Sequence, residues 1–118
     1  MPTPIPGTPF QIVIPTASTQ GQLVLLSAEM PVGTHVDPHV HDAEDQITIV
    51  ISGHVEARNG DNEIHATAGD VILHPRGIRH ELWNDGPEPA RVLEIYTPGG
   101  YERIHEARGR AALARQHE

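Results

Sequence analysis

Short apolar stretches alternate with turn-forming residues along most of the chain. Between residues 10 and 97 each stretch is only a few residues long, and Gly, Pro, Asn or Asp separates it from the next. This pattern predicts short strands, which we expect at Phe10–Ile14, Gln22–Met30, Gln46–Ser52, His54–Arg58, Glu63–Ala66, Val71–Leu73, Arg79–Trp83 and Arg91–Thr97. The dipeptide Asn59-Gly60 favours a two-residue hairpin because both residues tolerate a positive φ. So many short strands predict an all-β fold, a closed or nearly closed antiparallel barrel or jelly roll.

The two ends of the chain differ from its middle. Residues 1–9 contain four prolines, which predicts an extended arm or a tether at a sheet edge. After Pro98-Gly99-Gly100, residues 101–116 are rich in Ala, Arg, Glu and Leu, which predicts a short C-terminal helix. We expect Tyr101, Ile104 and Leu113 to anchor that helix. The expected organisation is therefore a single domain over residues 1–118, with an arm (1–9), a barrel (10–97) and a helix (101–116).

Composition excludes several kinds of chemistry and partner. The chain has 118 residues, no Cys, and no Lys among its eight basic residues. Disulfides, thiol nucleophiles, Schiff-base lysines and the phosphate-binding Walker lysine are therefore excluded. The formal net charge of -8 argues against nucleic acid or an anionic membrane as a partner. Since no signal-like or membrane-spanning apolar segment is present, we expect a soluble cytoplasmic protein.

Nine histidines, by contrast, direct attention to metal binding. His39 and His41 are two residues apart on what should be one strand, where period-two alternation places both side chains on the same face. His80 follows a Pro75-x-Gly77 turn, on a strand that antiparallel pairing can bring across a barrel to the first two. Converging imidazoles of this kind form a site for a divalent metal ion.

The spacing of these residues resembles the two motifs of the cupin superfamily, written G(X)5HXH(X)3-4E(X)6G and G(X)5PXG(X)2H(X)3N. The first motif is matched by Gly33, His39, His41 and Gly53, with Gln46 where the motif has Glu. The second is matched throughout, by Gly69, Pro75, Gly77, His80 and Asn84. The chain is similar to small single-domain bacterial cupins. The resemblance implies a double-stranded β-helix, or jelly-roll barrel, here followed by a short helix.

The resemblance also implies that His39, His41, Gln46 and His80 bind one divalent metal ion. Three imidazoles and an amide oxygen suit Mn, Fe, Co, Ni or Zn with little discrimination. Because these ligands are neutral, the ion would keep its full positive charge and act as a stronger Lewis acid, which favours non-redox chemistry. Asp45 fits the looser spacing of the motif, but alternation turns it to the opposite face if Gln46 faces inward. The alternative is a vestigial site that has lost its fourth ligand.

The last predicted strand offers catalytic partners for such a metal. Glu94 and Tyr96 share one face of it, opposite Leu93 and Ile95. If the first pair faces the cavity, a carboxylate and a phenol would be placed for proton transfer. This resembles cupins that linearise unsaturated uronic acids, in which an acid and an aromatic residue precede an Arg. Arg103 is only an approximate match to that Arg.

The remaining polar and apolar candidates have structural roles in this prediction. We expect the other histidines at the surface or at the rim of the barrel: His35, His54, His65, His74, His105 and His117. Trp83 is expected in the core or at a dimer contact, and Asn84 in a turn. The shape of the pocket is expected to depend on Val71, Leu73, Leu82 and Tyr96.

Three functions are compatible with these residues. The first is a metal-dependent lyase or isomerase that acts on a small oxygenated substrate, such as a sugar acid or a hydroxy or keto compound. The second is an iron-dependent cupin dioxygenase, and the third is a non-catalytic small-molecule-binding cupin. Cupins of this size usually pair through their sheets, so we expect a homodimer. Fold analogy alone does not choose among the reactions.

Overall fold

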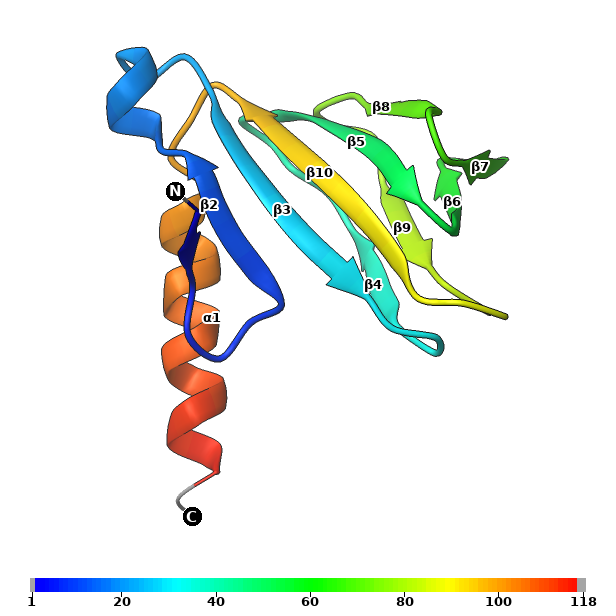
Figure 1. Cartoon of the computed structure of the whole chain (residues 1–118). Coiled ribbons are helices and arrows are strands. Elements are labelled where there is room, and N and C mark those ends of the chain that lie inside the picture. Colours follow the sequence, from blue (N-terminus) through cyan, green and yellow to red (C-terminus); the bar gives the residue numbers. More distant parts are fainter. Residues whose placement is uncertain (1, 117–118) are drawn as a thin grey trace.

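Two antiparallel sheets face each other, and one helix stands beside them (Figure 1). The computed structural model describes residues 2–116. The first sheet has the order β1-β2-β3-β10-β5-β8, and the second the order β4-β9-β6-β7. The elements are β1 (Thr3–Pro4), β2 (Phe10–Ile14), a 3-10 helix (Thr16–Thr19), β3 (Val24–Met30), β4 (His35–His39), β5 (Asp45–Ser52), β6 (His54–Asn59), β7 (Asn62–Thr67), β8 (Val71–His74), β9 (His80–Trp83), β10 (Ala90–Thr97) and α1 (Glu102–Arg115). The predicted all-β jelly-roll fold with a C-terminal helix is confirmed.

The core lies between the sheets and follows from alternation along the strands. In β3, Val24, Leu26, Ala28 and Met30 are buried, whereas the residues between them are half-buried or exposed. Val50, Val55, Ala57, Leu82 and Val92 complete the core from both sheets. Burying such apolar side chains stabilises the fold by roughly 1.5–3 kcal/mol for each large one.

The structure differs from the sequence prediction at three local points. Strand β4 ends at His39, although one strand was expected to carry both His39 and His41; its residues are mostly exposed and include Pro38, and it forms through pairing with β9. The hairpin between β6 and β7 turns at Gly60 and Asp61, one residue later than predicted, and Gly60 alone in it has a positive φ. In β8, Ile72 and His74 face inward, so Val71 and Leu73 are exposed and do not shape the pocket.

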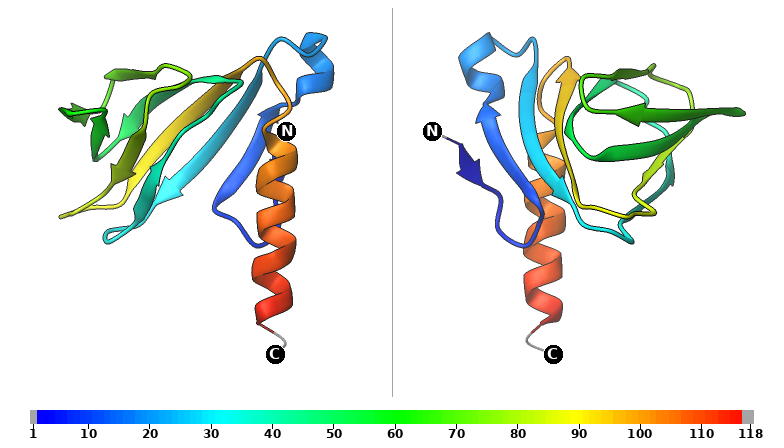
Figure 2. Two further views of the ribbon diagram at one scale, coloured as in Figure 1. Left: turned by 180° about the vertical axis from the view of Figure 1, so that it is seen from behind. Right: turned by 45° about the vertical axis from the view of Figure 1, so that its right-hand side comes forward.

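Helix α1 runs beside the edge of the first sheet and extends past it (Figure 2). Its first turn is held by Glu102, whose carboxylate accepts hydrogen bonds from the Thr16 N–H (2.9 Å) and the Thr16 hydroxyl (2.6 Å). Tyr101 is buried at the start of the helix, as predicted, but Ile104 is exposed and Leu113 is only half-buried. The inward-facing residues of the helix itself include His105 and Gly109.

Gly109 lets the helix and the N-terminal arm approach closely. A Cβ built on Gly109 would lie 2.1 Å from the Pro6 carbonyl oxygen, and one built on Gly7 would lie 2.3 Å from that of Gly109. Any side chain at either position would therefore separate the two backbones. The arm is also tied to the first sheet, since β1 pairs with β2. Within residues 2–116, no helix has the length and apolar character to cross a membrane.

The Gly109→Ala substitution tests this contact, because helix propensity and the close contact predict changes of opposite sign in the free energy of unfolding. Helix propensity alone predicts that Gly109→Ala stabilises the protein by about 1 kcal/mol. We expect the opposite, a loss of roughly 1–3 kcal/mol in the free energy of unfolding, because the new methyl group overlaps the Pro6 carbonyl. Urea denaturation measures the change. The control is Ala111→Gly at an exposed helix position, which should cost about 1 kcal/mol. A more stable Gly109→Ala variant would contradict the close approach.

Candidate metal centre and its cavity

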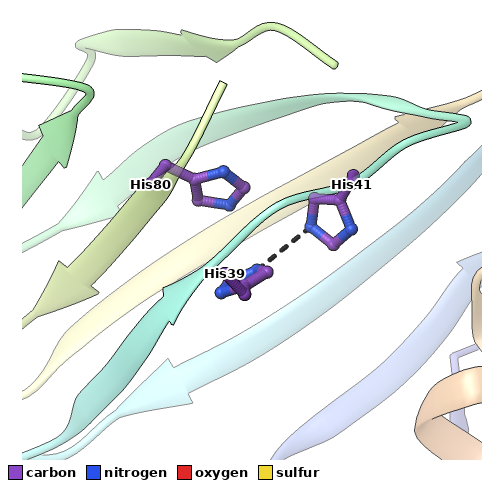
Figure 3. Close-up of side chains that lie close together, drawn as sticks. All are labelled: His39, His41 and His80. Carbon is purple, nitrogen blue, oxygen red and sulfur yellow. Dashed lines mark hydrogen bonds between the residues drawn. The ribbon is translucent and has the colours of Figure 1, made fainter. Parts of the chain in front are cut away.

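Three histidines converge where β4 and β9 meet (Figure 3). His39 ends β4 and pairs in register with His80, the first residue of β9. The Nε2 atoms of His39 and His41 are 3.1 Å apart, and one ring nitrogen from each of the three lies within 4.8 Å of the others. The cluster is half-buried to buried.

His41 reaches this cluster by a different route from the predicted one. The strand ends at His39, so His41 lies beyond it and strand alternation does not orient its side chain. Instead, the Gly77 N–H donates a hydrogen bond of 2.8 Å to the His41 carbonyl oxygen, from the turn that follows Pro75. Gly77 adopts a φ of 78° there, a conformation that favours glycine. The Pro-x-Gly turn therefore positions the backbone at His41.

Gln46 completes the convergence with an amide oxygen. Its Oε1 lies 2.9 Å from His41 Nε2 and 3.2 Å from His80 Nε2. Two donors bound to one divalent ion at about 2.0–2.1 Å, at tetrahedral or octahedral angles, are about 2.9–3.4 Å apart. These two separations and the 3.1 Å between His39 and His41 fall in that range. The residues therefore fit a single divalent ion.

The protonation of the rings also suits metal binding. The Asp37 carbonyl accepts a hydrogen bond from His39 Nδ1 at 2.8 Å, which leaves the lone pair of the neutral ring on Nε2. Burial lowers the pKa of His41, and it lowers that of His80 to about 4. The neutral form that ligates a metal is thus favoured. Asp45, the alternative ligand, instead pairs with Arg76 at 3.3 Å.

A second hydrogen bond of Gln46 connects the histidines to Glu94. The Gln46 amide nitrogen donates to Glu94 Oε2 at 2.6 Å, while its oxygen faces the imidazoles. A Glu at position 46 would bring two carboxylates together in a buried place, which is unfavourable unless one is protonated. The presence of Gln where the cupin motif has Glu therefore has a physical reason in this chain: the neighbouring acid is Glu94.

Glu94 and Tyr96 both face the cavity, and each is only 3% exposed. The Glu94 carboxylate also accepts hydrogen bonds from the Thr48 hydroxyl, 2.9 Å from each oxygen. Burial raises the pKa of Glu94 to about 7, although these hydrogen bonds act in the opposite direction. The Tyr96 hydroxyl lies 3.3 Å from His105 Nε2, and burial raises the pKa of that phenol. Leu93 and Ile95 lie half-buried on the other face.

His74 and His105 are buried, so their predicted place at the surface or rim was wrong. His74 is 1% exposed and joins a buried chain of polar groups: its Nδ1 lies 2.7 Å from Asn59 Oδ1, and its Nε2 lies 3.0 Å from the Thr48 hydroxyl. Burial lowers the pKa of His74 to about 3. His105 packs against Phe10, with ring centroids 4.0 Å apart, and burial lowers its pKa to about 4. The pattern of apolar and polar residues around His74 and His105 does not indicate that either side chain is buried.

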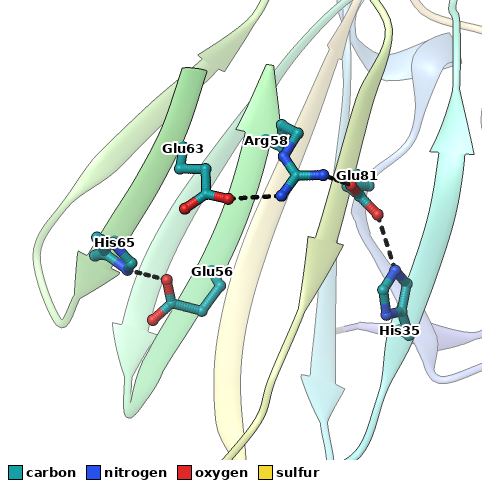
Figure 4. A network of polar contacts seen from close by, with 6 residues as sticks. All are labelled: His35, Glu56, Arg58, Glu63, His65 and Glu81. Atoms are coloured by element: carbon teal, nitrogen blue, oxygen red, sulfur yellow. Dashed lines mark hydrogen bonds and ion pairs between the residues drawn. The ribbon is translucent and has the colours of Figure 1, made fainter. Parts of the chain in front are cut away.

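Of the other described histidines, His35 and His65 are exposed, as predicted, and His54 is half-buried. Figure 4 shows His35 and His65 in polar contacts on the second sheet. His35 contacts Glu81 at 2.9 Å, Arg58 pairs with Glu81 and Glu63, and His65 contacts Glu56. His54, Glu56 and Asp85 form a second group whose ligand atoms lie within 4.8 Å of one another. None of these residues lines the cavity. His117 lies outside the described residues.

His39 and Gln46 of the candidate metal site line a cavity of about 530 Å³, whereas His41 and His80 do not line it. His39, Gln46 and Glu94 lie at one part of its lining, and Leu82 and Tyr96 contribute to it as predicted. Arg103 does not line it; Arg108, which the sequence analysis missed, does. The lining residues of this segment recur every three or four positions, so they share one side of α1, but this spacing alone does not show that this side faces the cavity: Tyr101, His105, Arg108, Ala112 and Arg115.

Comparison with known proteins establishes the family. The cupin domain model matches residues 26–96, and the chain belongs to this family. One curated relative, the tetracenomycin polyketide synthase protein TcmJ of Streptomyces glaucescens, is 30% identical over 70 residues, which are 59% of this chain and 47% of that protein. The chain thus aligns with about half the length of this relative.

Solved structures agree on the fold. An uncharacterised protein with a double-stranded β-helix domain from Klebsiella pneumoniae is 28% identical, with a TM-score of 0.66 and 76% of each chain covered. KdgF from Halomonas sp. is 21% identical, with a TM-score of 0.71 over 87% of this chain and 92% of that one. At that identity the second likeness concerns the fold alone.

The pairing of Gln46 with Glu94 can be tested by exchanging the two groups. We expect Gln46→Glu to lower the free energy of unfolding by about 2 kcal/mol at pH 8, because two ionised carboxylates would then meet in a buried place. Adding Glu94→Gln should restore most of the loss. Urea denaturation of the four proteins in a chelator measures both effects. A double variant no more stable than Gln46→Glu would contradict the pairing.

The burial of His105 predicts a dependence of stability on pH. Its pKa of about 4 in the folded protein lies below the ordinary value of 6.5, so its contribution is present above pH 6.5 and declines as the pH falls towards 4. Compared with His105→Gln, the wild type should therefore lose about 3 kcal/mol between pH 7.5 and pH 4. Urea titrations of both proteins at the two pH values measure this difference. An equal pH dependence in both would show that His105 does not cause it.

Proposed function

We propose that this cupin is a metal-dependent enzyme in which Glu94 transfers a proton on a small oxygenated substrate. The reaction class is isomerisation, elimination or lyase chemistry. One observation carries the proposal: the Gln46 amide contacts the histidine cluster through its oxygen and the Glu94 carboxylate through its nitrogen. A candidate acid–base group thus adjoins the candidate metal site in the same cavity.

The metal would be held by the imidazoles of His39, His41 and His80 and by the amide oxygen of Gln46. A divalent ion at this place would supply a Lewis acid that polarises a carbonyl or hydroxyl oxygen of the substrate. The ligand set suits Mn, Fe, Co, Ni or Zn. Because the four ligands carry no charge, they do not offset the charge of the ion.

Glu94 is suited to both directions of proton transfer. A carboxyl whose pKa is near 7 exists in both protonation states at neutral pH, so it can accept a proton from a substrate carbon or hydroxyl and return it. Gln46 and Thr48 fix the orientation of the carboxylate. Tyr96 lies on the same face of β10, where its hydroxyl can donate a hydrogen bond to a substrate oxygen.

Metal analysis tests the first half of this proposal. Protein purified without a histidine tag or chelator should contain about one equivalent of a divalent metal, and His41→Ala should lose it. His54→Ala, in the separate group on the outer face, is the matched control and should retain it. Iron in the site would favour the dioxygenase alternative. Failure to bind any divalent ion after reconstitution would overturn the metalloenzyme and favour a binding module.

Proton transfer can be tested before the natural substrate is known. Metal-loaded protein in D₂O should catalyse deuterium uptake next to the carbonyl of some small keto acids, measured by proton NMR. Glu94→Gln should slow this exchange by at least about 100-fold, because it removes the acid–base group. The exposed Glu88→Gln is the control and should exchange at the wild-type rate. Equal rates in the wild type and Glu94→Gln would exclude Glu94 as the base.

The predicted homodimer is a separate question, which sedimentation can answer.

A further inference from the structure

The cavity is apolar over much of its wall and polar at separate places. The side chains of Ala28, Met30, Leu82 and Val92 form part of the wall, and all four are buried residues of the core. These side chains offer no hydrogen-bonding group. The polar lining residues from the strands include His39, Gln46, Glu94 and Tyr96, and the C-terminal segment contributes Tyr101, His105, Arg108 and Arg115. Thr8 and Thr34 add two hydroxyl groups. A ligand that fills this cavity meets hydrocarbon between its polar contacts.

Such a wall disfavours a polyhydroxylated ligand. A sugar acid carries a hydroxyl group on most of its carbons, and each hydroxyl loses water when it is buried. A buried hydroxyl without a partner costs roughly 1–3 kcal/mol. An aromatic or alicyclic body of similar size instead gains roughly 25 cal/mol per Å² of apolar surface that it buries. The wall therefore selects against the sugar acid that the sequence analysis offered as one example of a substrate.

Arg108 offers the ligand a second polar contact in the cavity, besides the histidine cluster. Its guanidinium lies 6.0 Å from the centre of the Tyr101 ring, and that ring lies 4.7 Å from the ring of His41. Within residues 2–116, the arginines that form ion pairs are Arg58 and Arg76, and no carboxylate lies within 4.0 Å of Arg108. An Arg that lines a cavity and has no anionic partner there is well suited to bind a carboxylate.

The acidic residues of the lining do not oppose this role. One of them, Glu94, is buried and contacts Gln46. The other two, Glu29 and Asp37, come from strands β3 and β4, not from the helix. Both are exposed, and Glu29 alternates with the inward-facing Ala28 and Met30. Solvent therefore screens their charges, and because Arg108 is exposed as well, it also reaches that guanidinium.

We propose that the cavity takes a carboxylic acid with an apolar ring body, whose carboxylate binds Arg108 and whose hydroxyl or keto oxygen faces the histidine cluster. This inference rests on the proposed function for the place of that oxygen, but the apolar wall and Arg108 are independent of it. It names the substrate class: aromatic or alicyclic hydroxy and keto acids.

Binding of three probes to the zinc-loaded full chain tests the proposal by calorimetry. 6-Hydroxy-2-naphthoate has an apolar body with oxygens at both ends, 2-naphthol lacks the carboxylate, and D-galacturonate has a polar body. We expect 6-hydroxy-2-naphthoate to bind at least about tenfold more tightly than either of the others. Arg108→Gln should weaken its binding about tenfold and change that of 2-naphthol less than about twofold. Arg110→Gln, at an exposed position outside the lining, is the matched control.

The outcomes separate this inference from the proposed function. If galacturonate binds as tightly as the naphthoate, the inference that the ligand has an apolar ring body is overturned, even if zinc is bound. Equal losses of naphthoate and naphthol binding in Arg108→Gln would overturn the role of Arg108. Zinc content is measured in each sample, and a protein without zinc would overturn the metal centre alone. The preference for the naphthoate and its dependence on Arg108 should then persist in the metal-free protein.

Discussion

The hydrogen bond between the Gln46 amide and the Glu94 carboxylate is the constraint on which the site depends. It fixes the amide so that the oxygen turns to the histidines. It also gives a buried acid a partner that carries no charge, where a second carboxylate would be repelled. The two residues come from β5 and β10, adjacent strands of one sheet, where Gln46 lies opposite Tyr96 and Glu94 opposite Thr48, so they are diagonal neighbours on one face. A single amide thereby contacts both the candidate metal site and the proposed acid–base group.

The cavity depends on a second constraint, the close contact between the arm and the helix. Gly7 and Gly109 allow the two backbones to touch, and Phe10 then packs against His105. Residues from both segments line the cavity. Because the buried surface of α1 is small and carries polar groups, its position relies on this backbone contact and on the bonds between Glu102 and Thr16.

Much of the fold could be predicted from the sequence, because the strands have short apolar runs and clear turn residues. The convergence of His39, His41 and His80 was expected from motif spacing. The hydrogen bond from the Gly77 N–H that positions His41 was not, because a contact between two loops leaves no periodic pattern in the sequence. Position 74 was assigned wrongly because Val71–His74 is a run without alternation, so the inward face is undetermined. The choice of Arg108 over Arg103 depended on which side of α1 docks, and docking is set by a glycine rather than by apolar residues.

The boundaries of the family match divide the molecule in an informative way. Residues 26–96 contain the three converging histidines, Gln46 and Glu94, whereas Phe10, His105 and Arg108 lie outside that range. The barrel therefore carries the candidate metal ligands, Glu94 and the apolar wall of the cavity, whereas the helix adds Arg108. Exchange of the terminal stretches would change the arm and helix side of the cavity and leave the proposed reactive centre in place. Cupins that share this barrel can therefore differ in the compounds that they bind, because their terminal segments differ.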